Sequence, residues 1–244
     1  MLPKFLTGFG IFVVYYVIIV FLFLIIRALF HPPRELFRKM LHIMCAMSIF
    51  IVLHEFDTWY LAILNLAIFS LALYPIISYL ERFPKVMEVL VQRKSGEIRS
   101  SLVLVYVAMS ILIVIFWGWL GEQWKYIIVA SIMAWGFGDS LAALVGKAYG
   151  KNKIKSRFTD GKKTVEGTTT MSFAAFIAVF VVLLIYTSFP WYLCLLAASI
   201  VAPISALVEL ISHHGFDTIT VPLSAAVSLY FIMILFSFMG IKNV

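Results

Sequence analysis

A single acid in a long apolar segment is the first residue of this sequence that could do chemistry. Asp139 lies inside the apolar segment 123–145, where a charge is costly and therefore indicates a function. Ala142 and Gly146 follow at helical spacing, so small residues share the helix face of the acid and leave room for a bulky group. The alternative is a packing seam of Gly138, Ala142 and Gly146, with Asp139 hydrogen-bonded to a neighbouring helix.

A stretch rich in glycine and lysine follows Asp139. Between residues 146 and 167, lysines could supply point charges for phosphate, and glycines would let the backbone approach a ligand closely. The start of the next helix, near Glu166, would offer free backbone N–H groups to an anion. The alternative is a basic connection that contacts lipid headgroups. The stretch is not a Walker A loop, because its spacing differs and neither Ser nor Thr follows Lys151.

A second cationic group stands at the start of the apolar segment 36–54. Arg38 and Lys39 are four and three residues before His42, so all three side chains can point the same way from a helix. Arg38 and Lys39 also fit the role of ordinary anchors at the membrane interface.

Two more acids lie late in the chain. Glu209 is near the end of the apolar segment 191–212, and Asp217 opens the last one, where an acid also suits the helix dipole. His213 and His214 follow Glu209 but lack a second cluster with metal spacing, so the sequence does not predict a zinc site.

These residue types together suit Mg²⁺ and phosphate. Mg²⁺ is normally held by one or two carboxylates plus substrate phosphates, and the acids available are Asp139, Glu166, Glu209 and Asp217. Phosphoryl or nucleotidyl transfer needs that metal, cationic clamps and a positioned acceptor. Apolar helices around the site would give a lipid acceptor a route from the bilayer. The residues therefore indicate a membrane enzyme that handles a nucleotide or a phosphate and a lipid.

The elements that must position these residues are transmembrane helices. The chain of 244 residues is 63% hydrophobic and 13% charged, whereas a soluble domain carries roughly 25% charged residues. We expect an all-α fold, a polytopic membrane helical bundle in one domain, 1–244. Its eight predicted spans, each near the length of about 20 residues that crosses a bilayer, are 5–30, 36–54, 58–80, 100–118, 123–145, 168–187, 191–212 and 219–239.

The charges predict the orientation of this bundle. Sixteen of the 19 Lys and Arg lie in or beside the connections 31–39, 81–99 and 146–167, and five of the six Trp lie near the opposite ends. The positive-inside rule places the basic connections in the cytoplasm and both termini outside. Because this distribution explains the net charge of +7, we do not expect a nucleic acid partner. We do expect contact with membrane lipids.

The stretch 138–167 resembles the signature shared by two families of membrane enzymes that use CTP. Its acid, its Gly-Lys pairs and its Lys-Thr-x-Glu-Gly at 163–167 occur in the same order in both. One family is the CTP-dependent lipid-alcohol kinases, which act on dolichol, phytol, farnesol or diacylglycerol. The other is the CDP-diacylglycerol synthases.

The rest of the chain is more similar to the kinases, over about 35–225. Arg38-Lys39-x-x-His42 resembles an early motif of the kinases, and the stretch from Glu209 to Asp217-Thr218 resembles their ending. The Pro-Gly-His-Gly-Gly and Asp-Arg-x-Asp-Ser stretches of the synthases are absent from the sequence. Thr218 stands where the kinases usually carry Asn, which puts a role for that amide in question.

The resemblance implies transfer of the γ-phosphate of CTP to the hydroxyl of a membrane lipid alcohol, with Mg²⁺ as cofactor. The residues expected at the nucleotide are Gly146, Lys147, Gly150, Lys151, Lys162, Lys163, Thr164 and Gly167. The expected metal ligands are Asp139, Glu166, Glu209 and Asp217. The residues expected to take part in the chemistry are Asp139, Asp217, Arg38, Lys39 and His42.

Two alternatives stay open at this point. One is an enzyme like phosphatidate cytidylyltransferase, and the other is a transporter of a phosphorylated metabolite, since intramembrane acids beside cations also mark substrate pathways. Phytol, farnesol, a polyprenol and diacylglycerol fit the sequence equally well as acceptors. The expected location is the plasma membrane in a prokaryote, and the endoplasmic reticulum or plastid envelope in a eukaryote.

Overall fold

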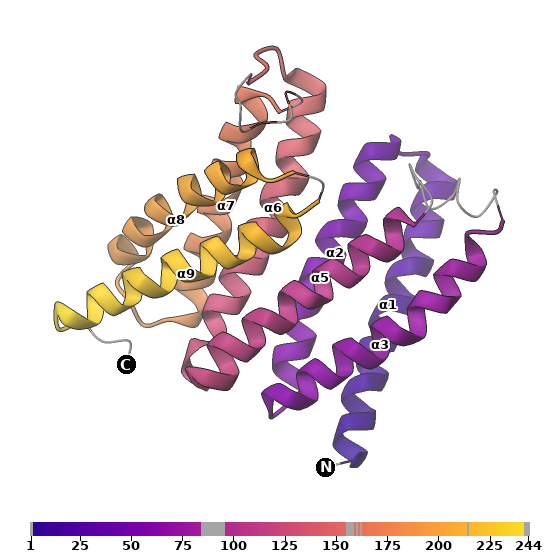
Figure 1. The fold of residues 1–244 in the computed structure, drawn as a ribbon, viewed down its shortest axis with the longest axis horizontal. Helices are drawn as coiled ribbons and strands as arrows, with labels where there is room; N and C mark the ends of the chain where they lie inside the picture. Colours follow the sequence, from indigo (N-terminus) through magenta and orange to yellow (C-terminus); the bar gives the residue numbers. More distant parts are fainter. Residues whose placement is uncertain are drawn as a thin grey trace. The chain divides into compact units, whose positions relative to one another are not determined.

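The protein is a set of long helices, shown for residues 2–83, 96–154, 159, 161, 163–213 and 215–241 by a computed structural model (Figure 1). A π-helical segment, η1, continues α5, and a short 3-10 turn, η2, precedes α6. The bounds are α1 Leu2–Phe30, α2 Arg34–Glu55, α3 Trp59–Leu80, α5 Glu97–Leu112, η1 Ile113–Trp119, η2 Glu122–Trp124, α6 Lys125–Tyr149, α7 Val165–Tyr186, α8 Trp191–Ile211 and α9 Asp217–Phe238.

The prediction of an all-α bundle with eight spans is confirmed. Within the described residues, eight helices are long and apolar enough to cross a membrane, with α5 and η1 forming one span and η2 and α6 another. The predicted ends agree to within a few residues in most spans. The largest extension is at α6, which was expected to end at 145 and continues to Tyr149. Its last turn thereby carries one basic side chain, that of Lys147, beyond the apolar part of the helix.

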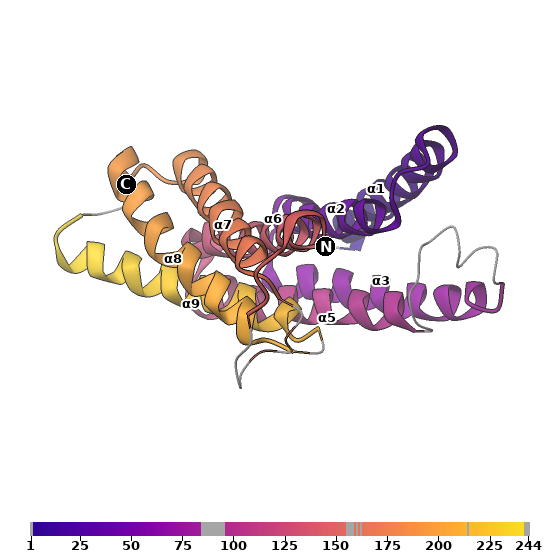
Figure 2. The same cartoon turned by 90° about the horizontal axis from the view of Figure 1, so that it is seen from above.

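By its internal contacts the chain divides into two compact units, residues 1–114 and 115–244. In the first unit, α1 packs along α2 and α3 lies beside α5 (Figure 2). An aromatic cluster joins α1, α3 and α5: the rings of Phe12 and Tyr16 lie 4.9 and 4.8 Å from that of Phe69, which lies 6.0 Å from the ring of Tyr106. Such rings bury large apolar areas, and they hold the unit together.

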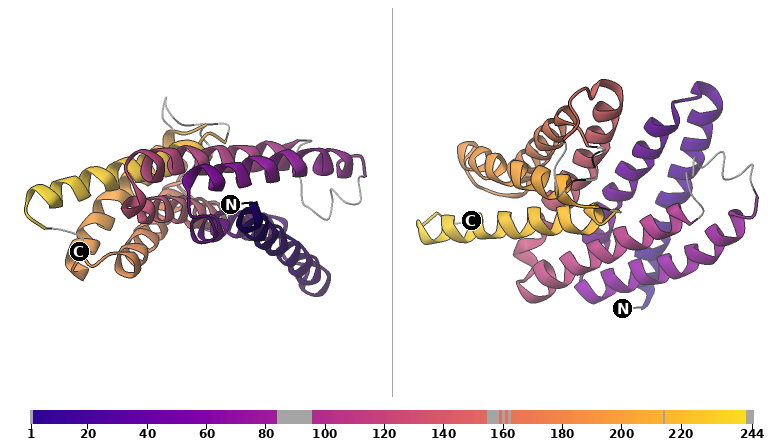
Figure 3. Two further views of the ribbon diagram at one scale, coloured as in Figure 1. Left: turned by 90° about the horizontal axis from the view of Figure 1, so that it is seen from below. Right: turned by 45° about the horizontal axis from the view of Figure 1, so that its top comes forward.

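In the second unit, α6 packs on α7, α7 on α8, α8 on α9 and α9 on α6, which closes a four-helix arrangement (Figure 3). Small residues let α6 and α7 approach closely. A Cβ atom added to Gly167 would lie 3.1 Å from the carbonyl oxygen of Ala142, and one added to Gly146 would lie 3.1 Å from Oγ1 of Thr164. The seam considered from the sequence is therefore a real packing feature.

Consecutive helices run in opposite directions in this unit. The end of α6, the start of α7, the end of α8 and the start of α9 consequently lie together at one end of it. Most of the polar residues singled out in the sequence, among them Glu209 and Asp217, lie at this end.

Candidate active site

Backbone hydrogen bonds hold the two ends of the connection between α6 and α7 together. Two backbone hydrogen bonds of 2.9 Å join its ends, one from Ile154 N to Lys163 O and one from Val165 N to Asn152 O. The backbone at the start of α7 is therefore fixed relative to the segment that leaves α6.

The Lys-Thr-x-Glu-Gly stretch builds the start of α7. Thr164 is the N-cap, and its Oγ1 accepts a hydrogen bond of 3.1 Å from Gly167 N, which satisfies one of the open donors of the first turn. The Glu166 carboxylate accepts hydrogen bonds from the backbone N and from Nδ2 of Asn152, the latter at 3.1 Å. Gly167 packs against α6, as described above. These residues thus have structural roles, and their contacts with nucleotide and metal remain predictions.

The two glycines predicted to let a phosphate approach lie at the same seam. Gly146 faces Thr164 and Gly167. Gly150 is the C-cap of α6, and its N–H donates to Gly146 O at 3.1 Å. Close packing of α6 and α7 is therefore sufficient reason for Gly146 to lack a side chain.

The four lysines predicted to bind the nucleotide differ in their surroundings. Lys147, on the last turn of α6, and Lys151, just after it, are exposed. Lys162 lies outside the described residues. Lys163 instead turns toward the end of α8, where its Nζ lies 2.8 Å from Oε1 of Glu209.

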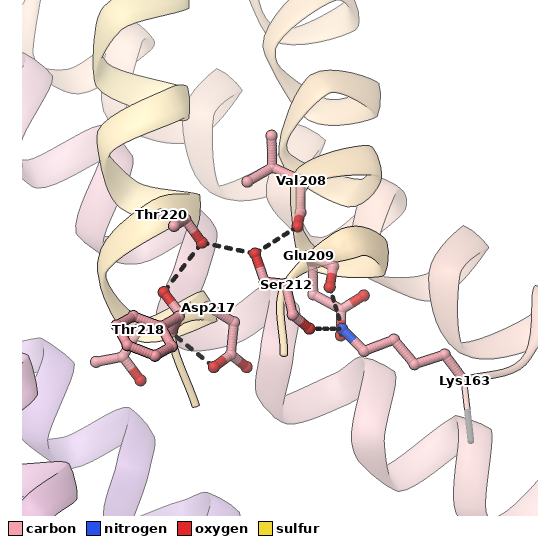
Figure 4. A network of polar contacts seen from close by, with 8 residues as sticks. Lys163, Val208, Glu209, Ser212, Asp217, Thr218 and Thr220 are labelled. Atoms are coloured by element: carbon pink, nitrogen blue, oxygen red, sulfur yellow. Dashed lines mark hydrogen bonds and ion pairs between the residues drawn. The ribbon is translucent and has the colours of Figure 1, made fainter. Parts of the chain in front are cut away.

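The turn from α8 to α9 is held by a network around Lys163 (Figure 4). The Lys163 ammonium also donates to the carbonyl oxygens of Glu209 and, at 3.3 Å, of Ser212. The hydroxyls of Ser212 and Thr220 are 2.7 Å apart and join the end of α8 to the first turn of α9. Asp217 begins α9, and its carboxylate accepts a hydrogen bond of 3.1 Å from Thr218 N.

One buried acid of the second unit, Glu209, is influenced by two further acids from other helices. The charges of Asp139 on α6 and Asp217 on α9 both act on Glu209 of α8. Glu209 is buried, and the other two acids are half-buried. Across the part of the chain that the structure describes, no three His, Cys, Asp or Glu side chains gather closely enough to hold a metal ion. Mg²⁺ would therefore need phosphate oxygens as further ligands, which is its usual coordination at nucleotide sites.

The predicted residues Arg38, Lys39 and His42 belong to the first unit. Arg38 bridges two carboxylates, with Nη2 2.5 Å from Oε1 of Glu35 and Nη1 3.3 Å from Oε1 of Glu97. This pairing ties the start of α5 to α2. Lys39 is buried and His42 is half-buried one turn further along α2.

A comparison with known proteins found a curated sequence that is similar to part of this chain. Over 95 residues, which are 39% of this chain, the sequence is 43% identical to the phytol kinase of Synechocystis sp.. This part of the chain is therefore similar to a phytol kinase. The matched part spans about two fifths of the length of that curated relative. No family model matches the chain, and no solved structure does.

The structure brings the predicted residues into two sets. The second unit holds Asp139, Glu209, Asp217 and the described part of the glycine- and lysine-rich stretch, and the first unit holds the Arg38 group. Glu35 was not predicted among these residues, although its spacing of three residues from Arg38 is a usable signal for a helical ion pair. Asn152 was not predicted as the partner of Glu166 either, because no local pattern relates those two positions.

Proposed function

We propose that this protein is a CTP-dependent kinase that transfers the γ-phosphate of CTP to the hydroxyl of a membrane lipid alcohol. The observation that carries the proposal is the similarity to phytol kinase. That relative makes phytol the first acceptor to test, ahead of farnesol, a polyprenol and diacylglycerol.

The geometry of the second unit supports phosphoryl transfer. The exposed side chains of Lys147 and Lys151 can meet a triphosphate from the aqueous side, and point charges of this kind stabilise phosphate oxygens. Asp139 lies in the interior of the apolar helix α6 and Asp217 is the first residue of α9, so the hydroxyl of a membrane lipid would approach both acids from the bilayer. The proposed site lies on the cytoplasmic side, because the basic connections are expected there.

Mg²⁺ fits the donors that are present. Asp139 and Asp217 would hold it together with phosphate oxygens, and the bound ion would neutralise charge on the phosphates. The protein's own contribution is to hold the triphosphate with lysines, to orient the acceptor hydroxyl and to accept its proton on a carboxylate.

Labelled CTP tests this function. Purified protein is supplied with Mg²⁺, phytol, farnesol, a polyprenol, diacylglycerol and phosphatidate, and with CTP labelled in parallel at the α- or the γ-phosphate. We expect lipid-soluble label from γ-labelled CTP alone, on a lipid alcohol. Label from α-labelled CTP would identify a cytidylyltransferase, and label from neither would favour the transporter.

A further inference from the structure

Lys163 has no hydrogen left for a phosphate in this structure. An ammonium group has three N–H donors. The three acceptors around Lys163 Nζ are Oε1 of Glu209, the carbonyl oxygen of Glu209 and the carbonyl oxygen of Ser212. All of them belong to the end of α8, so this lysine binds the protein itself.

The buried carboxylate of Glu209, at the end of α8, needs a cation beside it. Its side chain is in a transmembrane helix and only 8% of the residue is exposed. Asp139 and Asp217 add negative charge around it. A buried carboxylate is costly unless it is paired and hydrogen-bonded, and Lys163 supplies the ion pair.

The same contacts complete the end of α8. The last carbonyl groups of a helix lack partners within the helix and favour a cation. Lys163 donates to two carbonyl groups at this end, that of Ser212 and that of Glu209, which also accepts a hydrogen bond from Ser212 N at 3.2 Å. The hydroxyl of Ser212 in turn contacts the hydroxyl of Thr220 in α9, and the Thr220 hydroxyl donates a hydrogen bond of 3.0 Å to Phe216 O. Asp217 is the first residue of α9 after this turn, so the contacts of the turn determine where Asp217 lies (Figure 4).

We propose that Lys163 and Glu209 form a positioning pair that fastens the start of α7 to the end of α8 and so fixes the turn that carries Asp217. Lys163 then acts on the reaction through Asp217 and does not touch the nucleotide, in contrast to its predicted contact with the triphosphate. Contact with the triphosphate falls to the exposed Lys147 and Lys151. The kinetic part of this inference rests on the proposed kinase function, and its structural part does not.

A thermal double-mutant cycle tests the pair without any activity measurement. Lys163→Met, Glu209→Gln and the double variant are compared with the wild type in detergent. We expect Lys163→Met to lower the Tm by about 5 °C or more, because it leaves a buried carboxylate unpaired. The double variant should lose clearly less than the sum of the single losses. The matched control is the Lys125–Glu122 ion pair, whose carboxylate side chain is 70% exposed and which should show little coupling.

Kinetics then separate positioning from nucleotide binding. We expect Lys163→Met and Glu209→Gln to lower kcat by similar factors, roughly tenfold, with the KM for CTP changed less than twofold. Lys163→Arg should keep most of the activity, because a guanidinium can still donate to the carboxylate and to the carbonyl oxygens. Lys151→Met should instead raise the KM for CTP.

Two results would overturn the inference. The first is additive losses of Tm in the double variant. The second is a KM for CTP that rises tenfold or more in Lys163→Met while Glu209→Gln behaves as the wild type, which would make Lys163 a nucleotide ligand. If the wild type transfers no phosphate from CTP, the proposed function fails, and the thermal cycle alone decides whether the pair exists.

Discussion

Several charged side chains at the helix ends are already engaged by the protein itself. Lys163 pairs with Glu209, and Arg38 bridges Glu35 and Glu97. Ion pairs with little exposure fix geometry, because removing one partner leaves a poorly solvated charge. At the scale of single residues, the chemical role of a motif and its structural role therefore have to be separated by experiment, one side chain at a time.

Asp139 is the residue for which the chemical role is proposed most directly. Replacing it with Asn keeps its size but removes the charge that would hold Mg²⁺ or accept a proton. We expect Asp139→Asn to lower phosphoryl transfer by roughly 100-fold, the order of loss when a group that stabilises transition-state charge is removed. The measurement is incorporation of label from γ-labelled CTP.

The control for this variant is Asp57→Asn. Asp57 is an exposed acid that pairs with Lys4 and is predicted to lie on the opposite side of the membrane, so its loss should leave the rate unchanged. Turnover at the wild-type rate in Asp139→Asn would exclude Asp139 from the mechanism.

At the scale of elements, the contact between α6 and α7 determines where the basic connection begins. The two helices approach closely at Gly146 and Gly167, and Thr164 lies against the same place. A methyl group there has to displace the backbone or the N-cap of α7. The geometry of the connection therefore depends on residues that carry no functional group.

Alanine substitutions along the seam should differ in cost. We expect Gly146→Ala and Gly167→Ala to destabilise the protein by about 1–3 kcal/mol, the usual cost of overpacking. Gly138→Ala should cost less, because its Cβ would meet only the flexible end of Met171 as its nearest neighbour. The measurement is the Tm of each variant in detergent. An equal loss of Tm in Gly138→Ala and in Gly146→Ala would contradict this prediction.

Gly10→Ala is the matched control for this series. Gly10 lies in α1 with no atom within 4 Å of an added Cβ. Alanine is favoured over glycine inside a helix by roughly 0.5–1 kcal/mol, so this variant should be neutral or slightly more stable.

The helices could be predicted from the sequence, but which helices pack on one another and which side chains pair between them could not. Apolar length and flanking charge are local properties, so the eight spans follow from them. The extension of α6 to Tyr149 was missed because the hydropathy pattern ends where the membrane does, whereas the helix continues into a polar stretch. The pairing of Lys163 with Glu209 joins residues 46 positions apart, and periodicity within a helix does not reveal which helix packs on which.

At the scale of the whole molecule, the expected orientation puts the basic connections in the cytoplasm and makes a direct prediction. In a variant whose Cys45 and Cys194 are replaced by Ser, a cysteine introduced at Lys153 should react with a membrane-impermeant maleimide only from the cytoplasmic side. A cysteine introduced at Gln123 should react only from the other side. Both positions are exposed, so both should react in detergent. Labelling from the reverse sides would show that the predicted orientation is wrong.

The Lys163 contacts also have a consequence for biosynthesis. A ribosome makes the chain from its N-terminus, so the stretch between α6 and α7 leaves the ribosome before α8 exists. Glu209 and Ser212, which anchor Lys163, are translated only afterwards. A nascent chain that stops before α8 therefore carries every lysine of the basic stretch, yet it lacks the anchor that fastens the start of α7 to α8. Insertion of α8 into the bilayer is thus the step at which the newly made protein first acquires this anchor.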